Sequence, residues 1–278
     1  MRISVRRMFL LGVTILLMAQ QNSIAQTITS TGAGGNWDAS ATWIGGVVPS
    51  ASSDVVIAGP VGFATGSTEA SFPCRNLTVN SGGSLFNRTG YAWPDQILTV
   101  NGSVTNNGTI RNEGLSNGLV LRVKGSITHN GTWTIRRTEL NGAGTQTLSA
   151  GSGKKFECTM MVDATARPPI VAGSDLAFTA GFDLGKSTLD MKSFAVTLYG
   201  SSANISNGSV NNAKDVVGRT VNSANPNLND ITYDGSPTIK GRFRINTLVT
   251  FKGNVTVADT IESYYYYADP EKVLKIVG

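Results

Sequence analysis

The chain has 278 residues, of which 32 are glycines, and only 15% are charged. A single histidine and two cysteines exclude metal sites built on several histidines and cysteine-rich zinc modules. An apolar fraction of 40% is enough to bury a core, which argues against bulk disorder, and no uninterrupted apolar run reaches the roughly 18 residues of a membrane-spanning helix.

Residues 1–25 have the three parts of a secretory signal peptide. Three arginines form a basic start, an apolar stretch follows over 8–18, and small side chains at Ser23 and Ala25 precede Gln26. We therefore predict that 1–25 is removed on export and that the protein is secreted, either extracellular or at the cell surface. Without those arginines, 20 basic residues stand against 18 acidic ones, and a net charge of +2 gives no reason to expect a nucleic-acid partner.

After residue 26 the apolar residues alternate with polar ones in short runs bounded by Gly and Asn. Examples rich in Val, Leu and Thr are 76–79, 97–100 and 119–123. Asn-Gly pairs, which tolerate the positive φ of tight turns, separate many of these runs. Alternation with a period of two, together with such turns, predicts an all-β protein.

The strongest pattern is internal repetition. Segment 98–110 (LTVNGSVTNNGTI) aligns without gaps with 121–133 (LRVKGSITHNGTW), and 249–257 keeps the strand, the glycine and the second strand. Units of about 20 to 25 residues predict the rungs of a right-handed parallel β-helix, a solenoid in which each rung is stable only when stacked on its neighbours. Tandem antiparallel β-sandwich domains are the alternative; they suit Asn-Gly hairpins but explain the constant offset between the aligned segments less well.

The last residues repeat the strand and glycine that open each unit. This segment, 272–278, follows the third copy at about one repeat length, and the chain then stops where a second strand is expected. Because natural solenoids end in a polar capping unit, we expect further domains beyond it. The predicted organisation is a signal peptide over 1–25, an N-terminal cap over 26–60 and β-helix repeats over 61–278.

Three segments carry a resemblance to known proteins. Segment 35–49 (GNWDASATWIGGVVP), with two tryptophans before Gly-Gly and Pro, resembles the opening of many secreted proteins of Bacteroidetes-type bacteria and the eight-glycine ("G-eight") domain of extracellular proteins. Segments 141–149 (NGAGTQTLS) and 175–185 (DLAFTAGFDLG) are similar to phrases in the same bacterial group. The resemblance implies a β-helix surface or adhesin-like protein, commonly ending in a type IX secretion sorting domain, and no such ending is present in this sequence.

The two tryptophans of the opening segment have a physical explanation. The first rung of a solenoid would otherwise expose apolar strands and an unpaired backbone edge. Trp37 and Trp43 can cover that edge with large apolar rings, so we predict that they form the cap. The alternative is that Trp37 and Trp43 stack on sugar rings as ligand-binding residues.

Candidates for catalysis are few. Cleavage of polysaccharides needs paired carboxylates, or an acidic calcium site with a basic residue beside it. The closest candidates are Asp183 and Asp190, with Lys186 and Lys192 nearby, and all four are typical of solvated turns. His129 takes the place of an asparagine in the repeat and is expected on the surface of a turn. We therefore assign no catalytic residue, no metal ligand and no cofactor.

The tyrosine run 264–267 is a second candidate binding surface. In a strand, four consecutive tyrosines place two rings on each face. Tyr265 and Tyr267 could then offer flat, amphipathic contact area to a carbohydrate, as tyrosine does on many binding surfaces. The alternative is a loop packed against the edge of a rung.

The two cysteines, Cys74 and Cys158, lie several repeats apart in a chain predicted to be exported. If the rungs that carry Cys74 and Cys158 stack on one another, the two could form a disulfide bond. They could instead be small buried apolar residues.

These observations lead to three functional hypotheses. The first is a secreted, non-catalytic extracellular or cell-surface β-helix protein that acts in structural display or adhesion, with extracellular polysaccharide or matrix as partner. The second is a polysaccharide lyase or hydrolase of β-helix type, or the ancillary module of such an enzyme. The third is a carbohydrate-binding module. An enzyme should align charged residues on one lateral face of consecutive rungs, and a binding module should align aromatic residues.

Overall fold

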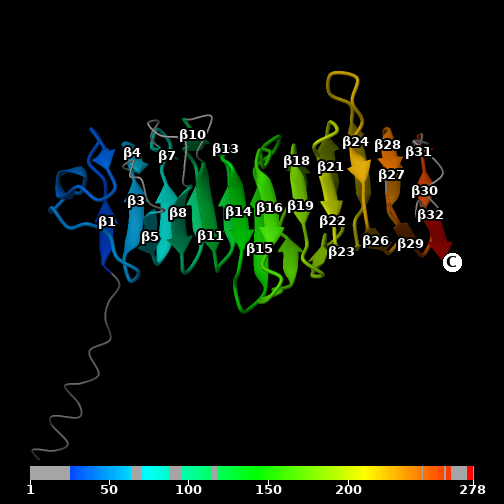
Figure 1. Cartoon of the computed structure of the whole chain (residues 1–278), viewed down its shortest axis with the longest axis horizontal. Helices are drawn as coiled ribbons and strands as arrows, with labels where there is room; N and C mark the ends of the chain where they lie inside the picture. Colours follow the sequence, from blue (N-terminus) through cyan, green and yellow to red (C-terminus); the bar gives the residue numbers. More distant parts are fainter. Residues whose placement is uncertain are drawn as a thin grey trace, which may run out of the picture.

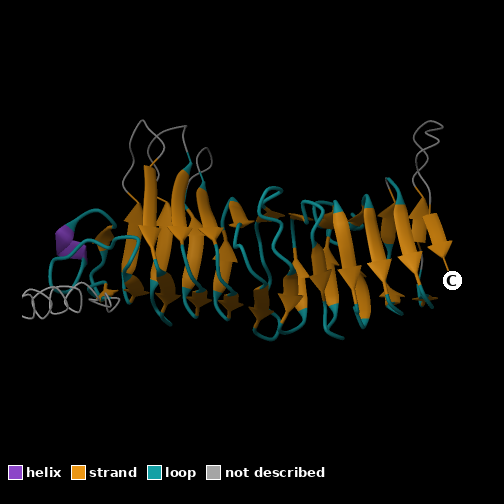
Figure 2. Cartoon of the chain, turned by 90° about the horizontal axis from the view of Figure 1, so that it is seen from below, coloured by secondary structure: helices purple, strands orange, loops and turns teal. Residues whose placement is uncertain are grey.

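The chain coils into an elongated rod of parallel strands, which runs from β1 at one end to β32 at the other (Figures 1 and 2). This computed structural model describes residues 26–63, 70–87, 95–113, 118–245, 247–259, 261–263 and 274–277. The predicted signal peptide and the tyrosine run 264–267, with Tyr265 and Tyr267, lie outside the described residues. All described strand pairs are parallel, so the antiparallel β-sandwich alternative is wrong and the right-handed parallel β-helix is the fold.

A complete turn of the coil contributes one strand to each of three faces, except that the turn of β15 and β16 has only an isolated bridge at Phe156 on the second face. The first face is a single sheet of twelve strands, which runs the length of the rod. Its strands are, in order, β1 (Thr27–Thr29), β3 (Asp54–Ile57), β6 (Asn76–Val79), β9 (Val104–Asn106), β12 (Ile127–His129), β15 (Gln146–Ala150), β17 (Ile170–Ala172), β20 (Thr188–Asp190), β23 (Gly208–Asn211), β26 (Ile231–Asp234), β29 (Val249–Lys252) and β32 (Leu274–Val277).

The second and third faces are each divided into two sheets. The second face has a sheet of β2 (Gly35–Asn36), β4 (Pro60–Phe63), β7 (Ser84–Asn87), β10 (Thr109–Asn112) and β13 (Thr132–Thr134), then a sheet of β18 (Leu176–Phe178), β21 (Val196–Tyr199), β24 (Asp215–Arg219), β27 (Thr238–Lys240) and β30 (Thr256–Val257). The third face has a sheet of β5 (Ala70–Cys74), β8 (Gln96–Val100), β11 (Leu119–Val123), β14 (Arg137–Leu140), β16 (Thr159–Val162), β19 (Gly181–Asp183) and β22 (Asn204–Ser206), then a sheet of β25 (Asn227–Leu228), β28 (Phe243–Ile245) and β31 (Ile261–Ser263).

The sequence repeat corresponds to physical stacking. Val104 lies beside Ile127 in adjacent strands, as the offset between the two aligned segments predicts. The third copy is in a different phase, because its first strand, β29, belongs to the first face, whereas β8 and β11 belong to the third. The strand predicted within 272–278 is present as β32, where Leu274 pairs with Val249 of the preceding turn.

The core is a set of columns that run along the axis of the rod. On the first face, Val55, Leu77 and Val104 occupy successive positions of one column, and each is at most 1% exposed. Strands of adjacent turns are about 4.8 Å apart, so inward side chains of successive turns touch directly. Further along the same face, the rings of Tyr233 and Phe251 stack with their centroids 5.2 Å apart. Stacking of this kind buries apolar surface that a single turn could not bury alone.

The N-terminal end of the rod is closed by the two tryptophans. Trp37 and Trp43 are 1% and 2% exposed, and their ring centroids lie 5.2 Å apart in an edge-on arrangement. The indole Nε1–H of Trp43 donates to the carbonyl of Trp37 at 2.7 Å, and Trp37 also stacks on Phe63 at 5.3 Å. Both rings are thus enclosed by protein together with the short 3₁₀-helix η1 (Ser40–Thr42), and neither offers an open face to a sugar. Within the predicted cap over 26–60, β1 and β3 are already strands of the first face.

Of the two alternatives for Cys74 and Cys158, the disulfide bond is excluded. Cys74 ends β5 and Cys158 directly precedes β16, and three strands (β8, β11 and β14) lie between β5 and β16 in the sheet. Four strand spacings correspond to about 19 Å, whereas a disulfide needs Cα atoms within about 7 Å. Both cysteines are free and buried, as in the alternative interpretation.

The surface position expected for His129 is also wrong. His129 is 1% exposed, because the end of β12 turns its side chain into the rod. There it lies beside Asn106 of the preceding turn and packs against the rings of Trp133 and Phe156, with centroid distances of 5.5 and 5.1 Å. His129 is therefore part of the core.

Candidate functional site

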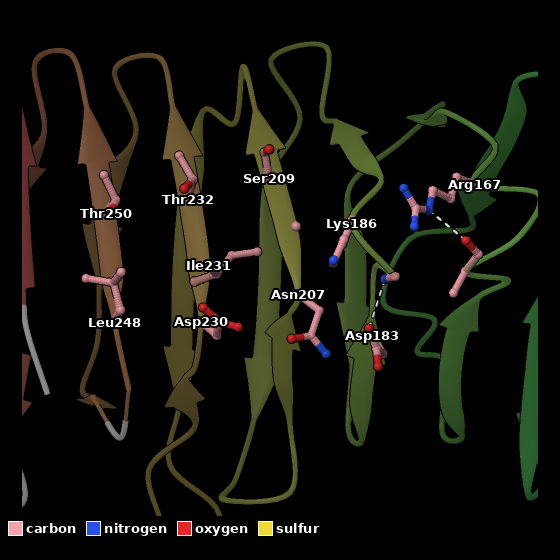
Figure 3. A pocket seen from close by; sticks show the side chains of 13 residues that line it. Arg167, Asp183, Lys186, Asn207, Ser209, Asp230, Ile231, Thr232, Leu248 and Thr250 are labelled. Carbon is pink, nitrogen blue, oxygen red and sulfur yellow. Dashed lines mark hydrogen bonds between the residues drawn. The ribbon is translucent and has the colours of Figure 1, made fainter. Parts of the chain in front are cut away.

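An open groove of about 680 Å³ lies at the corner where the third face turns into the first. It crosses several turns of the coil, from the segment before β17 to β29 (Figure 3). Its lining includes four charged residues, Arg167, Asp183, Lys186 and Asp230, and the amide side chain of Asn207. We call this feature the corner groove.

The corner itself is built from residues with left-handed backbone. Lys186, Asn207 and Asp230 have φ values of 71°, 56° and 45°, and each lies in the tight turn that leads into a strand of the first face. The backbone N–H of Lys186 donates to the backbone carbonyl of Asn207 at 2.5 Å. The backbone N–H of Asn207 donates in turn to the backbone carbonyl of Asp230 at 3.0 Å. Asn and Asp adopt this conformation readily, whereas for lysine it is strained. The stacked turns place the three residues in one line along the rod.

A row of hydroxyl groups forms the wall on the first face. Ser209, Thr232 and Thr250 pair in register on β23, β26 and β29 and follow one another across these strands (Figure 3). Alternation along each strand turns their neighbours inward, while the hydroxyl-bearing side chains face the groove. Since the strands are about 4.8 Å apart, the hydroxyl groups repeat at that spacing.

The charges gather toward one end of the corner groove, where Figure 3 shows Arg167, Lys186 and Asp183 near one another. The Nε–H of Arg167 donates to the carbonyl of Ala164 at 2.6 Å, and Asp183 Oδ1 accepts from the amide of Gly185 at 2.8 Å. Among the described residues, neither Arg167 nor Lys186 takes part in an ion pair. Two cations are therefore available to a ligand at this end.

At the other end the lining is partly apolar. Leu248 is 43% exposed and lies beside Thr250 and the largely buried Ile231 (Figure 3). An exposed aliphatic side chain next to hydroxyl groups can take the C–H surface of a polar, ring-shaped ligand.

The structure separates the four charged residues considered for catalysis. Asp183 and Lys186 both line the corner groove. Asp190 lies outside it and forms an ion pair of 2.8 Å with Lys192. Although partial burial of its carboxyl acts in the opposite direction, hydrogen bonds from Lys192 and Asn212 lower the pKa of Asp190. Asp190 and Lys192 thus neutralise one another's charge on the surface.

Sequence reasoning missed Arg167, Asn207 and Asp230 as lining residues. They lie on three separate turns of the coil, and only the register of the turns brings them together. The one usable signal is the Asn-Gly turn at Asn207, which predicts a tight turn but not the groove.

Tyr199 on β21 is an aromatic residue of the second face that was also missed. The ammonium of Lys155 lies 4.1 Å from the centre of its ring. Two smaller hollows of about 420 and 460 Å³ meet at Tyr199. Because Lys155 already lies over the ring, this tyrosine offers less free aromatic surface than an unpartnered one.

The described residues contain neither a candidate metal site nor a candidate membrane-spanning helix. They contain no cluster of three or more His, Cys, Asp or Glu side chains that could hold a metal ion. They also contain no helix with the length and hydrophobicity needed to cross a membrane. No protein-family model, curated protein or solved structure matches the chain.

Proposed function

We propose that this protein is a secreted, non-catalytic β-helix protein of the extracellular space or cell surface, which acts in display or adhesion by holding polysaccharide along its side. The observation that carries the proposal is the corner groove, which crosses several turns and joins a repeating row of hydroxyl groups to charged and apolar side chains. A polymer with a repeating pattern of hydroxyl groups suits such a repeating wall. Weak contacts repeated on successive turns add up through multivalency.

The proposal is tested by blocking the groove without changing the core. Thr232 faces the groove from β26, and Thr232→Trp would fill it with a large ring. Thr128→Trp is the matched control, because Thr128 is also an outward threonine of the first face but lies on β12, outside the groove. The mature chain is passed over columns of insoluble cellulose, chitin, xylan and cross-linked polygalacturonate.

We expect at least one of these polysaccharides to retain the protein, and Thr232→Trp to abolish the retention while Thr128→Trp leaves it intact. Equal retention of both variants would contradict a role for the groove. No retention of the unmodified protein on any of the polysaccharides would contradict the proposed function itself.

Export has its own test. Expression of the full chain in a bacterial host, followed by N-terminal sequencing of the exported product, should give Gln26 as the first residue. An exported or cell-retained product that still begins at Met1 would contradict cleavage of the signal peptide.

A polysaccharide-cleaving enzyme is the second candidate, because two carboxylates, Asp183 and Asp230, line the same groove. Against it, the general acid of a glycosidase is ordinarily buried among apolar side chains, whereas Asp230 is exposed and Asp183 is half-buried. Incubation of the protein with each polysaccharide, followed by assays for new reducing ends and for unsaturated products, separates the candidates. Product formation that is lost in both Asp183→Asn and Asp230→Asn would establish the enzyme and overturn the non-catalytic proposal.

A further inference from the structure

We infer that the corner groove binds a polysaccharide that carries uronic acids, with Arg167 and Lys186 holding a sugar carboxylate. This inference rests on the proposed function, since it specifies the chemical class of the polysaccharide. It starts from two exposed cations at one end of the groove that form no ion pair among the described residues.

The guanidinium of Arg167 is held in place before any ligand arrives. Its backbone has a left-handed φ of 44°, its amide donates to the carbonyl of Asp163 at 2.8 Å, and its Nε–H donates to the carbonyl of Ala164 at 2.6 Å. The carboxylate of Asp163 in turn accepts from the amides of Thr165 and Ala166 at 2.7 and 3.2 Å. These contacts order the loop, so that less conformational entropy is lost when the terminal guanidinium nitrogens bind an anion.

Lys186 complements Arg167 at the same end of the groove. Its left-handed backbone, with a φ of 71°, is fixed by the hydrogen bond from its amide to Asn207. A planar guanidinium binds a carboxylate through paired N–H groups, and an ammonium adds a compact point charge. Together they form a site for one carboxylate.

The rest of the groove explains why the ligand is a polymer of sugars and not a free anion. Asp183, Asn207 and Asp230 supply oxygen acceptors for sugar hydroxyl groups, and the row of Ser209, Thr232 and Thr250 extends across two strand spacings, about 10 Å. Leu248 offers apolar surface at the far end.

The experiment uses the mature chain and three soluble probes: oligogalacturonate, oligo-alginate and carboxyl-reduced oligogalacturonate, which has the same backbone without the charge. Dissociation constants are measured by calorimetry for the unmodified protein, Arg167→Gln, Lys186→Gln and the double variant. Lys192→Gln is the matched control, since Lys192 is also an exposed lysine with left-handed backbone, close to Lys186 in the chain, but is paired with Asp190 outside the groove. Thermal unfolding of every variant verifies that the fold is intact.

We expect the unmodified protein to bind at least one uronate probe, and each groove substitution to weaken binding by roughly tenfold or more, as for a charged hydrogen bond. The control should bind like the unmodified protein. Removing the carboxyl groups from the probe should weaken binding to the unmodified protein but not to the double variant, because the partner charges are then already absent.

Other outcomes overturn the inference in distinguishable ways. Equal affinity for oligogalacturonate and its carboxyl-reduced form would remove the role of the carboxylate while leaving polysaccharide binding in place. Retention on cellulose, chitin or xylan without affinity for either uronate would do the same. A preference for a nucleic-acid oligomer over all sugar probes would overturn both the inference and the proposed function.

Discussion

Asn106 and His129 stack on one another inside the rod, where Asn106 Nδ2 lies 3.4 Å from His129 Nδ1. On the other side of the ring, His129 Nε2 lies 3.1 Å from the carbonyl oxygen of Lys155. A carbonyl can only accept, so Nε2 carries the proton and Nδ1 accepts from the asparagine amide. The two neighbours therefore fix the tautomer that the buried histidine adopts when its imidazole is neutral.

This arrangement predicts a loss of stability in mild acid. Burial lowers the pKa of His129 to about 4 from 6.5, although the hydrogen bond to Lys155 acts in the opposite direction, and the charge of Lys154 lowers it further. Between those two pH values the unfolded chain binds the proton and the folded chain does not, so folding becomes less favourable as the pH falls from 6.5 toward 4. The full loss is of the order of 3 kcal/mol.

Urea unfolding at pH values from 7.5 to 4.5 measures this loss. The variant His129→Asn, which restores the asparagine of the preceding repeat, should be less stable at neutral pH by about 2 kcal/mol, because it leaves space beside Trp133 and Phe156. Its stability should nevertheless change less than that of the unmodified protein over the same pH range. An identical pH dependence in both proteins would rule out His129 as the source.

Close stacking of the turns makes one glycine far less replaceable than another. A Cβ on Gly131 would lie 1.9 Å from the carbonyl oxygen of Gly108 in the preceding turn, whereas a Cβ on Gly144 would meet nothing within 4 Å. We expect Gly131→Ala to reduce the free energy of unfolding by about 3 kcal/mol and Gly144→Ala to change it by less than about 0.5 kcal/mol. Chemical denaturation of the two variants in parallel checks this difference, and similar stabilities would mean that the turns are further apart than described.

The two cysteines should behave as inert, reduced core residues. Burial raises the pKa of each thiol to about 12, and at Cys74 the nearby carboxylate of Asp54 contributes to this rise. Because the thiolate is the reactive species, a thiol reagent such as Ellman's should label neither Cys74 nor Cys158 at pH 8 until the protein is unfolded. A reducing agent should leave the melting temperature unchanged. A melting temperature that falls on reduction would restore the disulfide hypothesis.

Individual residues show how far the sequence can predict this molecule. Val104 and Ile127 occupy equivalent positions of the two aligned segments. The constant offset of these segments predicts both the fold and the strand register, because identical turns must stack position on position. The disulfide alternative failed because Cys74 and Cys158 lie several repeat lengths apart, and each added turn moves them one strand spacing further from one another. His129 was misplaced because an alternating pattern at a corner does not tell which side chain turns inward.

The corner groove was beyond prediction for a related reason. The stretch of chain from Lys186 to Asn207 is shorter than the stretch from Asn207 to Asp230, so the turns in this half of the rod vary in length. Without a constant offset, no alignment places the three residues in one line. Only the strand register of β20, β23 and β26 brings them to the same corner.

Tyr233 leads to the last prediction, which concerns a substitution that stabilises the protein. Its side chain is fully buried against Phe251, and within the described part of the chain its hydroxyl group has no hydrogen-bond partner. A buried hydroxyl without a partner has lost its bonds to water and gained none in return. Tyr233→Phe removes that group and keeps the stacked ring, so the free energy of unfolding should rise by about 1 kcal/mol. Tyr199→Phe, at a partly exposed tyrosine of the second face, is the control and should change stability little. Urea unfolding at pH 7 measures both, and a Tyr233→Phe variant less stable than the unmodified protein would show that the hydroxyl is bonded within the core.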